Sequence, residues 1–556
     1  MKLSSAKNHT LLLFAIAFNL LIVLFLVSSY TSDDTVTSVP NVPDESYLSP
    51  NSIDEWFDAD ALTQYRFWQG MENGDKISDW KVSTVNLYFP NISLFGISYF
   101  TFKNPGLSLL GYVLVQFGAI LLLFSWLAKQ LSLKYRHESA IVAVLLLSIF
   151  GLSPLYGPDL HFFYNILMPF HSGMFVTVLL SLVFFFKSID GNSKVHIPLL
   201  SASVILATIS NSLYHVYFTF PVVLVSLFAL IKEPSIYIRP LITIFASVGA
   251  GLLLTNILPD LAITVPLTGD RWQSYKMLEY TMLNLFNSSL LMRIILTVYA
   301  LTFIYSVAVS AHALYKIITT KIYSISRHQL FQMIFAATAI ASFAAPVVAG
   351  NFVGIYCIRY VLYSIMIGVF NAVVVLTYYA DKYDRRLITY PMYAMLLGAL
   401  LYVSIRGSKQ NPFGAFERVK NFNNSIAVAT DSLSKKYALK NGIADFWDAG
   451  PISVFSKQNI KVVHTYFDLA LWWHASNATA IKRDSIGQPS VFNFVALRRW
   501  NDTTQLCAFF GDSIVRVTEG GHRFYLVPEF QYNTELHPVL TGKFDFAEEL
   551  KRMTDN

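Results

Sequence analysis

The stretch Leu107-Ser-Leu-Leu-Gly-Tyr-Val-Leu-Val-Gln-Phe-Gly-Ala-Ile-Leu-Leu-Leu-Phe-Ser-Trp-Leu127 contains no charged residue and few polar ones. A helix that crosses the hydrocarbon core of a bilayer needs about 20 mainly apolar residues, because every backbone polar group must be paired within the segment. This stretch meets both requirements. It therefore predicts a membrane-spanning helix.

The rest of the chain repeats this signal. Of its 556 residues, 54% are hydrophobic and only 14% are charged, and the mean hydropathy is +0.47. A soluble globular protein is far less apolar. We therefore predict an α-helical polytopic membrane protein with about eleven spans. The predicted spans cover residues 11–29, 107–127, 140–155, 171–186, 197–213, 217–231, 241–258, 290–314, 330–350, 356–379 and 389–405.

Two of these spans have an alternative interpretation. The first follows Lys2 and Lys7 as a signal peptide would, but no clear small-residue cleavage site comes after it, so we interpret it as a retained anchor. The segment from Asn211 to Pro221 joins two short spans, and a broken or re-entrant helix is equally compatible with its sequence.

The distribution of basic residues predicts the orientation. With the amino terminus in the cytoplasm, the inner connectors hold fifteen Lys and Arg residues, whereas the short outer connectors hold only Arg271, Lys276 and Arg359. The positive-inside rule favours this arrangement, and the odd number of spans then puts the carboxyl-terminal tail outside. The net charge of +6 thus reflects orientation, so we expect no nucleic acid partner.

Four regions follow from this layout. Residues 1–30 form the membrane anchor, 31–106 an acidic first outer loop, 107–405 the multi-span domain, and 406–556 an outer soluble α/β domain of normal size. In the tail, alternating segments at 460–466, 492–497, 505–510, 514–518 and 523–527 predict strands, and 425–440 predicts a helix. The only cysteines are Cys357 and Cys507, which exclude a disulfide framework and leave a single bridge between them open.

The first outer loop contains the run Glu55-Trp-Phe-Asp-Ala-Asp-Ala-Leu-Thr-Gln-Tyr-Arg66. On an extended backbone Asp58 and Asp60 point the same way, so both carboxylates are candidates to bind a divalent cation such as Mg²⁺ or Mn²⁺, or to act as a catalytic base. The alternative is that Asp58 caps a helix that starts near Ala59. Trp80, later in the loop, is an aromatic residue suited to stacking on a sugar.

Other candidates for the outer face are histidines, basic residues and tail aromatics. His161 and His171, with Asp159 and His215, have no metal-site spacing and are compatible with proton transfer, phosphate binding or plain interfacial hydrogen bonding. Cationic side chains suit an anionic lipid phosphate, whereas snorkelling is the competing explanation, above all for Arg293. The candidates for substrate binding are Arg66, Trp80, His161, His171, Arg271, Lys276, Arg359, Trp472 and Trp473.

Several blocks resemble bacterial membrane proteins of the GT-C glycosyltransferase architecture. They cover most of the chain in short segments of moderate specificity, and Asn91 and Asn211 stand where acids are expected. The blocks are Phe57-Asp-Ala-Asp-Ala-Leu62 with Trp80 and Tyr88-Phe-Pro-Asn91, Met168-Pro-Phe-His171-Ser-Gly173, Ser210-Asn-Ser-Leu213, Ile358-Arg-Tyr360, Gly442-Ile-Ala-Asp-Phe-Trp447 and Phe492-Asn-Phe-Val495.

The resemblance implies a reaction and a location. Enzymes of this type transfer a sugar from a polyprenyl-phosphate carrier to an acceptor outside the membrane, with an acid of the first outer loop near the donor phosphate. Carried over, these roles fall on Asp58 and Asp60, and the implied location is the bacterial inner membrane with the tail domain in the periplasm. The implied acceptor is a cell-surface glycan such as a lipopolysaccharide O-antigen. A lipid or polysaccharide transporter and a glycan polymerase or ligase are the alternatives.

Overall fold

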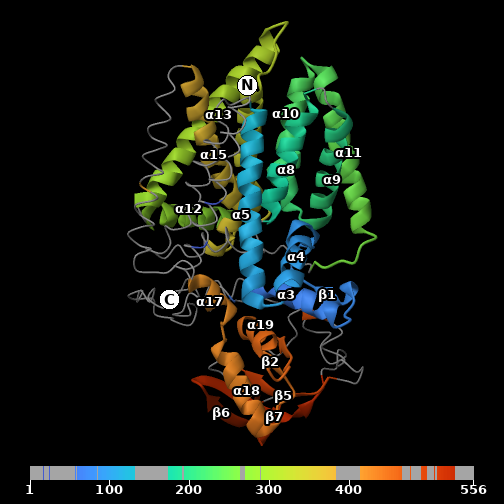
Figure 1. Ribbon diagram of the computed structural model, residues 1–556. Coiled ribbons are helices and arrows are strands. Elements are labelled where there is room, and N and C mark those ends of the chain that lie inside the picture. Colours follow the sequence, from blue (N-terminus) through green and yellow to red (C-terminus); the bar gives the residue numbers. More distant parts are fainter. Residues whose placement is uncertain are drawn as a thin grey trace.

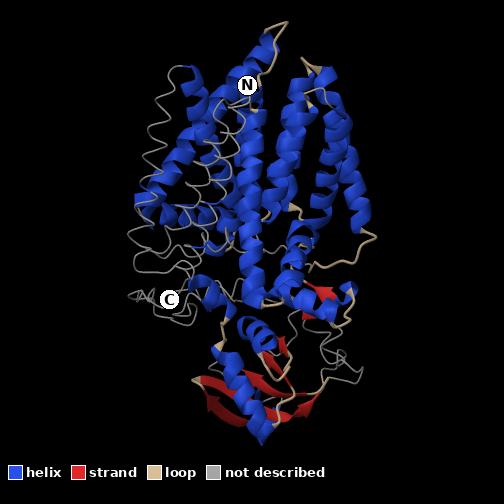
Figure 2. Ribbon diagram, in the orientation of Figure 1, coloured by secondary structure: helices blue, strands red, loops and turns tan. Residues whose placement is uncertain are grey.

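The computed structural model consists of a bundle of long helices above a smaller α/β domain (Figures 1 and 2). It describes residues 17, 24, 57, 59–83, 85–131, 173–190, 193–262, 270–288, 290–382, 398, 414–465, 476–477, 490–496, 506–507 and 510–531.

Five helices of the bundle are long and apolar enough to cross a membrane. They lie within α5 (Pro105–Gln130), α11 (Pro234–Thr255), α13 (Leu290–Thr319), α14 (Arg327–Val348) and α15 (Arg359–Lys382). Three shorter apolar helices pack among them: α8 (Gly173–Ser188), α9 (Ser193–Ser210) and α10 (Phe220–Leu230). These eight match eight of the predicted spans. The predicted spans at 11–29, 140–155 and 389–405 lie outside the described residues except at three single positions, so the count of about eleven stays a prediction.

The amino termini of α5 and α14 are marked by capping residues in the sequence. The side chain of Asn104 accepts a hydrogen bond from the Leu107 amide at 3.0 Å, and Pro105 occupies the first turn of α5. At α14, the side chains of Ser326 and Gln329 form a capping box. The ends of these two helices are therefore set locally, before any packing between helices.

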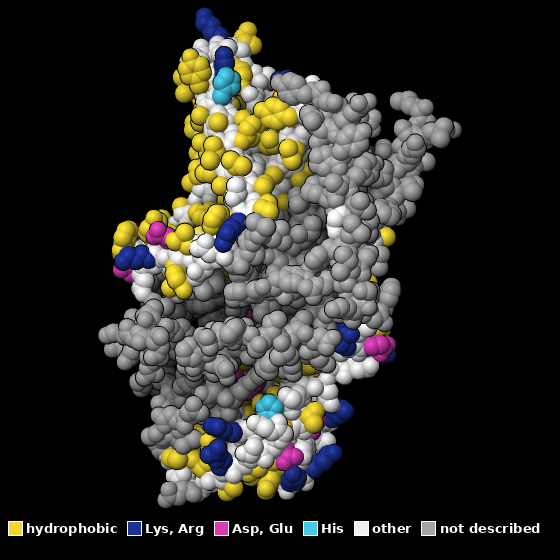
Figure 3. Space-filling view, turned by 90° about the vertical axis from the view of Figure 1, so that its left-hand side faces the viewer, with side chains coloured by type: hydrophobic (Ala, Val, Ile, Leu, Met, Phe, Trp, Pro, Cys, Tyr) yellow, Lys and Arg dark blue, Asp and Glu magenta, His cyan; other side chains and the backbone are white. Residues whose placement is uncertain are grey.

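The bundle has apolar side chains on its outside. Leu301 and Ile304 of α13 are 63% and 62% exposed, which a soluble helix would avoid but a lipid-facing helix requires. Figure 3 shows many hydrophobic side chains on the surface of the described helices. Inside, the ring of Phe370 on α15 stacks on Phe124 of α5 at 4.3 Å, so α15 lies in the bundle core.

One polar cluster is buried among α13, α14 and α15. Ser306 donates to the side-chain oxygen of Gln332 at 2.6 Å, and Gln332 donates to Asn371 at 2.8 Å. The amide nitrogen of Asn371 donates back to both partners, at 3.0 and 2.9 Å. All three side chains are fully buried, so this ring fixes the rotation of the three helices about their axes.

The two ends of the bundle differ in charge. We call the end against the α/β domain the domain end, and the opposite end the basic end. Which end faces the cytoplasm stays a prediction, and that prediction is based on this unequal distribution of Lys and Arg between the two ends. The basic end carries Lys129, Lys187, Lys194, Lys232, Lys316, Lys321, Arg327 and Lys382.

The segment from Asn211 to Pro221 forms a turn between two helices at the domain end. α9 ends at Ser210, and the π-helix η6 (His215–Thr219) leads into α10. The amide of Tyr214 donates to the carbonyl of Asn211 at 3.1 Å, which closes the turn. The segment therefore joins two separate apolar helices that run in opposite directions.

The tail domain contains a five-stranded sheet of order β3-β2-β5-β7-β6. The first three strands are parallel, and β7 and β6 add on as an antiparallel hairpin. The helices α17, α18 and α19 precede or connect these strands, and α18 and α19 pack on one face through Leu433 and Ile452. The elements are α17 (Gly414–Lys420), α18 (Ser425–Tyr437), β2 (Asn441–Ala444), α19 (Phe446–Phe455), β3 (Val462–His464), β5 (Phe492–Ala496), β6 (Val515–Glu519) and β7 (His522–Phe530).

The prediction of a strand at 505–510 is wrong, because the described residues Leu506, Cys507 and Phe510 are helical. The other four predicted strands coincide with β3, β5, β6 and β7, and the predicted helix with α18. Both cysteines are free, Cys357 buried and Cys507 exposed, so the structure has no bridge between them.

The first outer loop is folded onto the domain end. It contains α3 (Ala59–Glu72), the short helix η3 (Ile77–Asp79), β1 (Trp80–Lys81), the π-helix η4 (Tyr88–Ile92) and α4 (Ser93–Phe102). β1 pairs with β4 (Ser476–Asn477), which comes from the tail. The loop therefore lies between the bundle and the tail domain.

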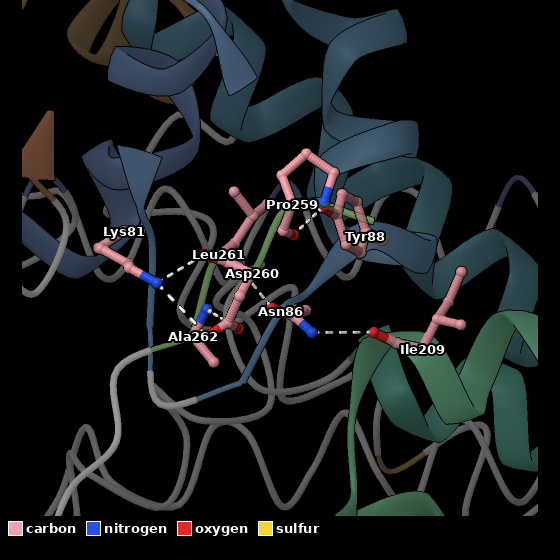
Figure 4. A network of polar contacts seen from close by, with 8 residues as sticks. All are labelled: Lys81, Asn86, Tyr88, Ile209, Pro259, Asp260, Leu261 and Ala262. Atoms are coloured by element: carbon pink, nitrogen blue, oxygen red, sulfur yellow. Dashed lines mark hydrogen bonds and ion pairs between the residues drawn. The ribbon is translucent and has the colours of Figure 1, made fainter. Parts of the chain in front are cut away.

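A polar network fastens the loop to the connector after α11 (Figure 4). Lys81 donates to the carbonyl of Asp260 at 2.6 Å, and the amide of Leu261 donates to the side chain of Asn86 at 2.8 Å. Asn86 also donates to the carbonyl of Ile209 at 3.3 Å, and Tyr88 to the carbonyl of Pro259. One side chain, Asn86, thus holds both α9 and the connector.

Glu72 at the end of α3 makes this loop sensitive to acid. Its carboxylate accepts from Tyr99 at 2.6 Å and from Lys103 at 2.5 Å, and these bonds, that to Lys103 first, lower the pKa of Glu72. Because the pKa of Glu72 is lower in the folded protein, these bonds contribute fully to stability above the pKa of the unfolded chain. This stabilisation is lost as the pH falls through the pKa of the folded protein. We expect the melting temperature of the wild type to fall towards that of Glu72→Gln on acidification, measured by thermal unfolding in detergent. Parallel curves for the two proteins would contradict this expectation.

Candidate functional site

Asp60 lies in the first turn of α3, which begins at Ala59. Ala59 is fully buried and packs against Phe446, the first residue of α19. A Cβ added to Gly450 on α19 would lie 3.0 Å from Ala59, so the two helices are in close contact. The acidic motif therefore sits where the outer loop meets the tail domain.

Arg359 approaches Asp60 from the bundle. It is the first residue of α15, directly after the short helix η7 (Ile355–Ile358), and the charge of Asp60 is the weakest of several influences on its guanidinium. The guanidinium also lies over the ring of Tyr360, 5.4 Å from the ring centre. Both Asp60 and Arg359 are half-buried. Asp60 and Arg359 thus lie within electrostatic reach of each other, although they are far apart in the sequence.

Tyr217 binds the backbone next to Arg359. Its hydroxyl donates to the backbone carbonyl of Tyr360, and its own carbonyl accepts from Thr338 on α14 at 3.3 Å. Tyr217 belongs to η6, and π-helices of this kind occur often at functional sites. The first turn of α15 is therefore tied to η6, which is tied in turn to α14.

Two helices, α3 and α19, begin in contact with each other at this place. Each helix amino terminus carries a partial positive charge from its unpaired amide groups. Together with Arg359 they create a local environment that favours an anion, next to the carboxylate of Asp60. This arrangement can hold a phosphate and, beside it, accept a proton.

The argument that placed Asp58 and Asp60 side by side on an extended backbone is wrong at Asp60, because this residue is helical. Residues two apart on a helix do not share a face. The helix start at Ala59 is the one that the capping alternative expects, while Asp58 itself lies outside the described residues. In the described part of the chain, no three His, Cys, Asp or Glu side chains are grouped to hold a metal ion, and a divalent cation stays a prediction.

Arg66 lies deep in the outer loop on α3. Burial lowers the pKa of its guanidinium to about 10, and Nη1 is buried without a hydrogen-bond partner. A buried cation is costly unless a counter-charge accompanies it. This position agrees with a role in binding an anion, which stays a prediction.

Trp80 does not present a ring face for a sugar. It is 3% exposed, packs edge-on against Phe67 at 5.6 Å, and lies against Gly70, where a Cβ would come within 2.6 Å of the ring. The structure therefore supports a core role for Trp80 in the loop, which differs from the stacking role expected from the sequence.

Arg271 and Lys276 lie on α12 (Arg271–Ser288), and both are exposed. Lys276 lies over the ring of Trp272 at 5.6 Å. α12 packs against α13, α14 and η7, so it borders the element that precedes Arg359. The predicted residues His161, His171, Trp472 and Trp473 lie outside the described part of the chain, as does Asp159.

The two asparagines at expected acid positions have structural partners. Asn91 is buried, and its side chain fills the space beside Gly173 at the start of α8. Asn211 accepts from the amide of Leu213 at 3.0 Å and thereby stabilises the turn after α9. Of the three histidines predicted for the outer face, only His215 lies within the described part of the chain, and its Nδ1 lies 3.1 Å from the Thr219 hydroxyl.

The sequence did not single out a group of buried polar residues at the edge of the tail sheet. Asp445 follows β2 and caps α19 by accepting from the Asp448 amide at 3.0 Å, while His464 and Thr465 stand at the end of β3. The carboxyl ends of neighbouring parallel strands commonly form ligand sites. The order strand, acid, helix at 441–455 was the available signal, since an acid directly after a buried strand marks such an edge.

This edge adjoins Asp60 through Phe446, which follows Asp445 and touches Ala59. The candidate site thus consists of the adjoining starts of α3 and α19, with Asp60 and Asp445, and of Arg359 within electrostatic reach of Asp60. No protein-family model matches this chain, and no curated protein matches it either.

Proposed function

We propose that this protein is a membrane glycosyltransferase that moves a sugar from a polyprenyl-phosphate donor to a cell-surface glycan, such as a lipopolysaccharide O-antigen, at the outer face of the bacterial inner membrane. What supports the proposal most is that an acid, Asp60, and a cation, Arg359, lie within electrostatic reach of each other at the domain end of the membrane helices. An acid and a cation at this level suit a reaction between a lipid phosphate and a sugar hydroxyl.

The two side chains have complementary roles in such a reaction. Asp60, or Asp58 beside it, accepts the proton of the acceptor hydroxyl as the new bond forms between that oxygen and the anomeric carbon. The bond from the anomeric carbon to the phosphate oxygen breaks, and the lipid phosphate leaves with an additional negative charge. Arg359 and the amino termini of α3 and α19 offset that charge.

The location of the site also supports a lipid-linked donor. α15 starts at Arg359 and continues into the bundle, so a lipid tail beside the helices can keep its phosphate near Arg359. The acceptor would come from the other side, where the tail domain contributes Asp445 and the start of α19. One substrate thus reaches the site from the membrane and the other from water.

The test is a direct transfer assay. The full-length protein in lipid nanodiscs is incubated with polyprenyl-phosphate-linked sugars and glycan from cells that lack the gene, and the product is analysed by mass spectrometry. We expect one donor to add a sugar with a new linkage. A glycan that keeps its linkages in this assay, while its amount at the cell surface changes on gene deletion, would instead favour the transporter.

A further inference from the structure

The helix α12 has two faces of different character. Ser274, Leu278, Thr281 and Leu285 are buried against the bundle, at the spacing of one helical face. The other face is exposed along its whole described length. The question is what covers that outer face in the membrane-embedded protein.

The outer face is unusually rich in aromatic residues. Trp272 is 62% exposed and stacks on Tyr275 at 5.4 Å, and Tyr280, Leu283 and Phe286 continue the row. A surface in contact with water alone rarely exposes so many large apolar groups together. Trp and Tyr are, however, enriched where a membrane protein meets the lipid headgroups, because their rings are apolar and carry one polar group.

Basic side chains accompany the aromatic row. Arg271 and Lys276 are exposed on the same face, and the ammonium of Lys276 lies over the ring of Trp272. Arg293 follows at the start of α13 and is also exposed. Cations with apolar stems beside aromatic rings suit the phosphates of the headgroup layer.

The placement of α12 agrees with this composition. Figure 1 shows α12 lying across the domain end of the membrane helices instead of along them. The lipid-facing surface of α13, with Leu301 and Ile304, continues directly from α12 along the chain. On the side seen in Figure 3, charged side chains lie just below the hydrophobic cover of the helices.

We infer that α12 is an interfacial helix whose outer face lies in the phospholipid headgroup layer, with the aromatic row towards the acyl chains and Arg271 and Lys276 near the phosphates. Helices of this kind sit about 5–10 Å into the boundary between headgroups and acyl chains. Since α12 packs on η7, directly before Arg359, this assignment sets the bilayer surface at the level of the candidate site. It does not depend on the proposed reaction.

Spin-label depth measurements test the inference on the full chain. A Cys507→Ser background removes the exposed thiol, and Cys357 is buried. Labels are placed at Gln273→Cys on α12, at Leu301→Cys on α13 and at Lys435→Cys on α18, all exposed positions. The protein is reconstituted into phosphatidylethanolamine and phosphatidylglycerol vesicles, and the accessibility of each label to oxygen and to a water-soluble nickel complex is compared.

We expect the label at 273 to show an intermediate depth, between the lipid-exposed label at 301 and the water-exposed label at 435. The double change Trp272→Ser and Tyr275→Ser is expected to move it towards the values at 435, whereas the control Tyr437→Ser on α18 leaves it unchanged. Values equal to those at 435 in the unaltered helix would overturn the inference. So would shielding from both reagents, which would indicate coverage by a second copy of the chain.

Discussion

Asp60→Asn is expected to lower the rate of sugar transfer by about 10²–10⁴-fold, the usual contribution of a positioned base. Asparagine keeps the size of the side chain but cannot take up the hydroxyl proton. The assay is the nanodisc transfer reaction with mass spectrometry of the product. Asp79→Asn is a matched control, because Asp79 is a partly exposed acid of the same loop outside the candidate site and is expected to be dispensable. Full activity of Asp60→Asn would remove Asp60 from the mechanism and leave Asp58 to be tested in the same way.

A double-mutant cycle separates a shared role from two independent ones. If Asp60 and Arg359 act on the same transition state, Arg359→Gln is expected to lower the rate by about 10²–10³-fold. The double variant should then lose less than the product of the two single losses, because groups that act as a unit are not additive. Purely multiplicative losses would contradict joint action. The lysine variant Arg359→Lys, which keeps the charge, is expected to retain part of the activity.

The second large effect concerns the buried ring of Ser306, Gln332 and Asn371. Asn371→Leu leaves two buried polar partners with unmet hydrogen bonds, and we expect a loss of about 1–3 kcal/mol in the free energy of unfolding. Unfolding in detergent, followed by circular dichroism during titration with sodium dodecyl sulfate, measures this loss.

The control for this effect removes the whole ring. Ser306→Ala, Gln332→Leu and Asn371→Leu together leave no unpaired group, so the triple variant is expected to be more stable than Asn371→Leu alone. A triple variant that is less stable than the single one would mean that packing volume, and not hydrogen bonding, is the main contribution of these residues.

The membrane helices were predictable because their signal is local. A run of about 20 apolar residues predicts a spanning helix whatever packs around it. The observed helices differ from the predicted spans mainly at their ends, as at Pro105 and Arg327, where the helix starts before the apolar run. Short apolar runs carry less information. The short run around Leu506 predicts a strand but is helical where it is described, because a run of that length does not distinguish a strand from a helix.

The composition of the candidate site was only partly predictable. Asp60 and Arg359 were each recognisable as candidates, the acid from its motif and the arginine from the scarcity of outer bases. The distance between them depends on how the outer loop folds onto the bundle and the tail domain, and no sequence period reports such long-range packing. β2 escaped prediction because Asn441-Gly-Ile-Ala444 is too short to show alternation.

The fastening of the outer loop has a consequence for biogenesis. Val82 bonds to Leu261, Asn104 to the carbonyl of Lys420, and Asp75 to Asn477, so the loop is completed by segments made much later than itself. Contacts this distant in sequence form late and slowly. During synthesis, the loop therefore stays incomplete until the tail has been made. A chain halted before residue 477 would lack the partners of Asp75 and of β1, and its first loop would stay partly unpaired.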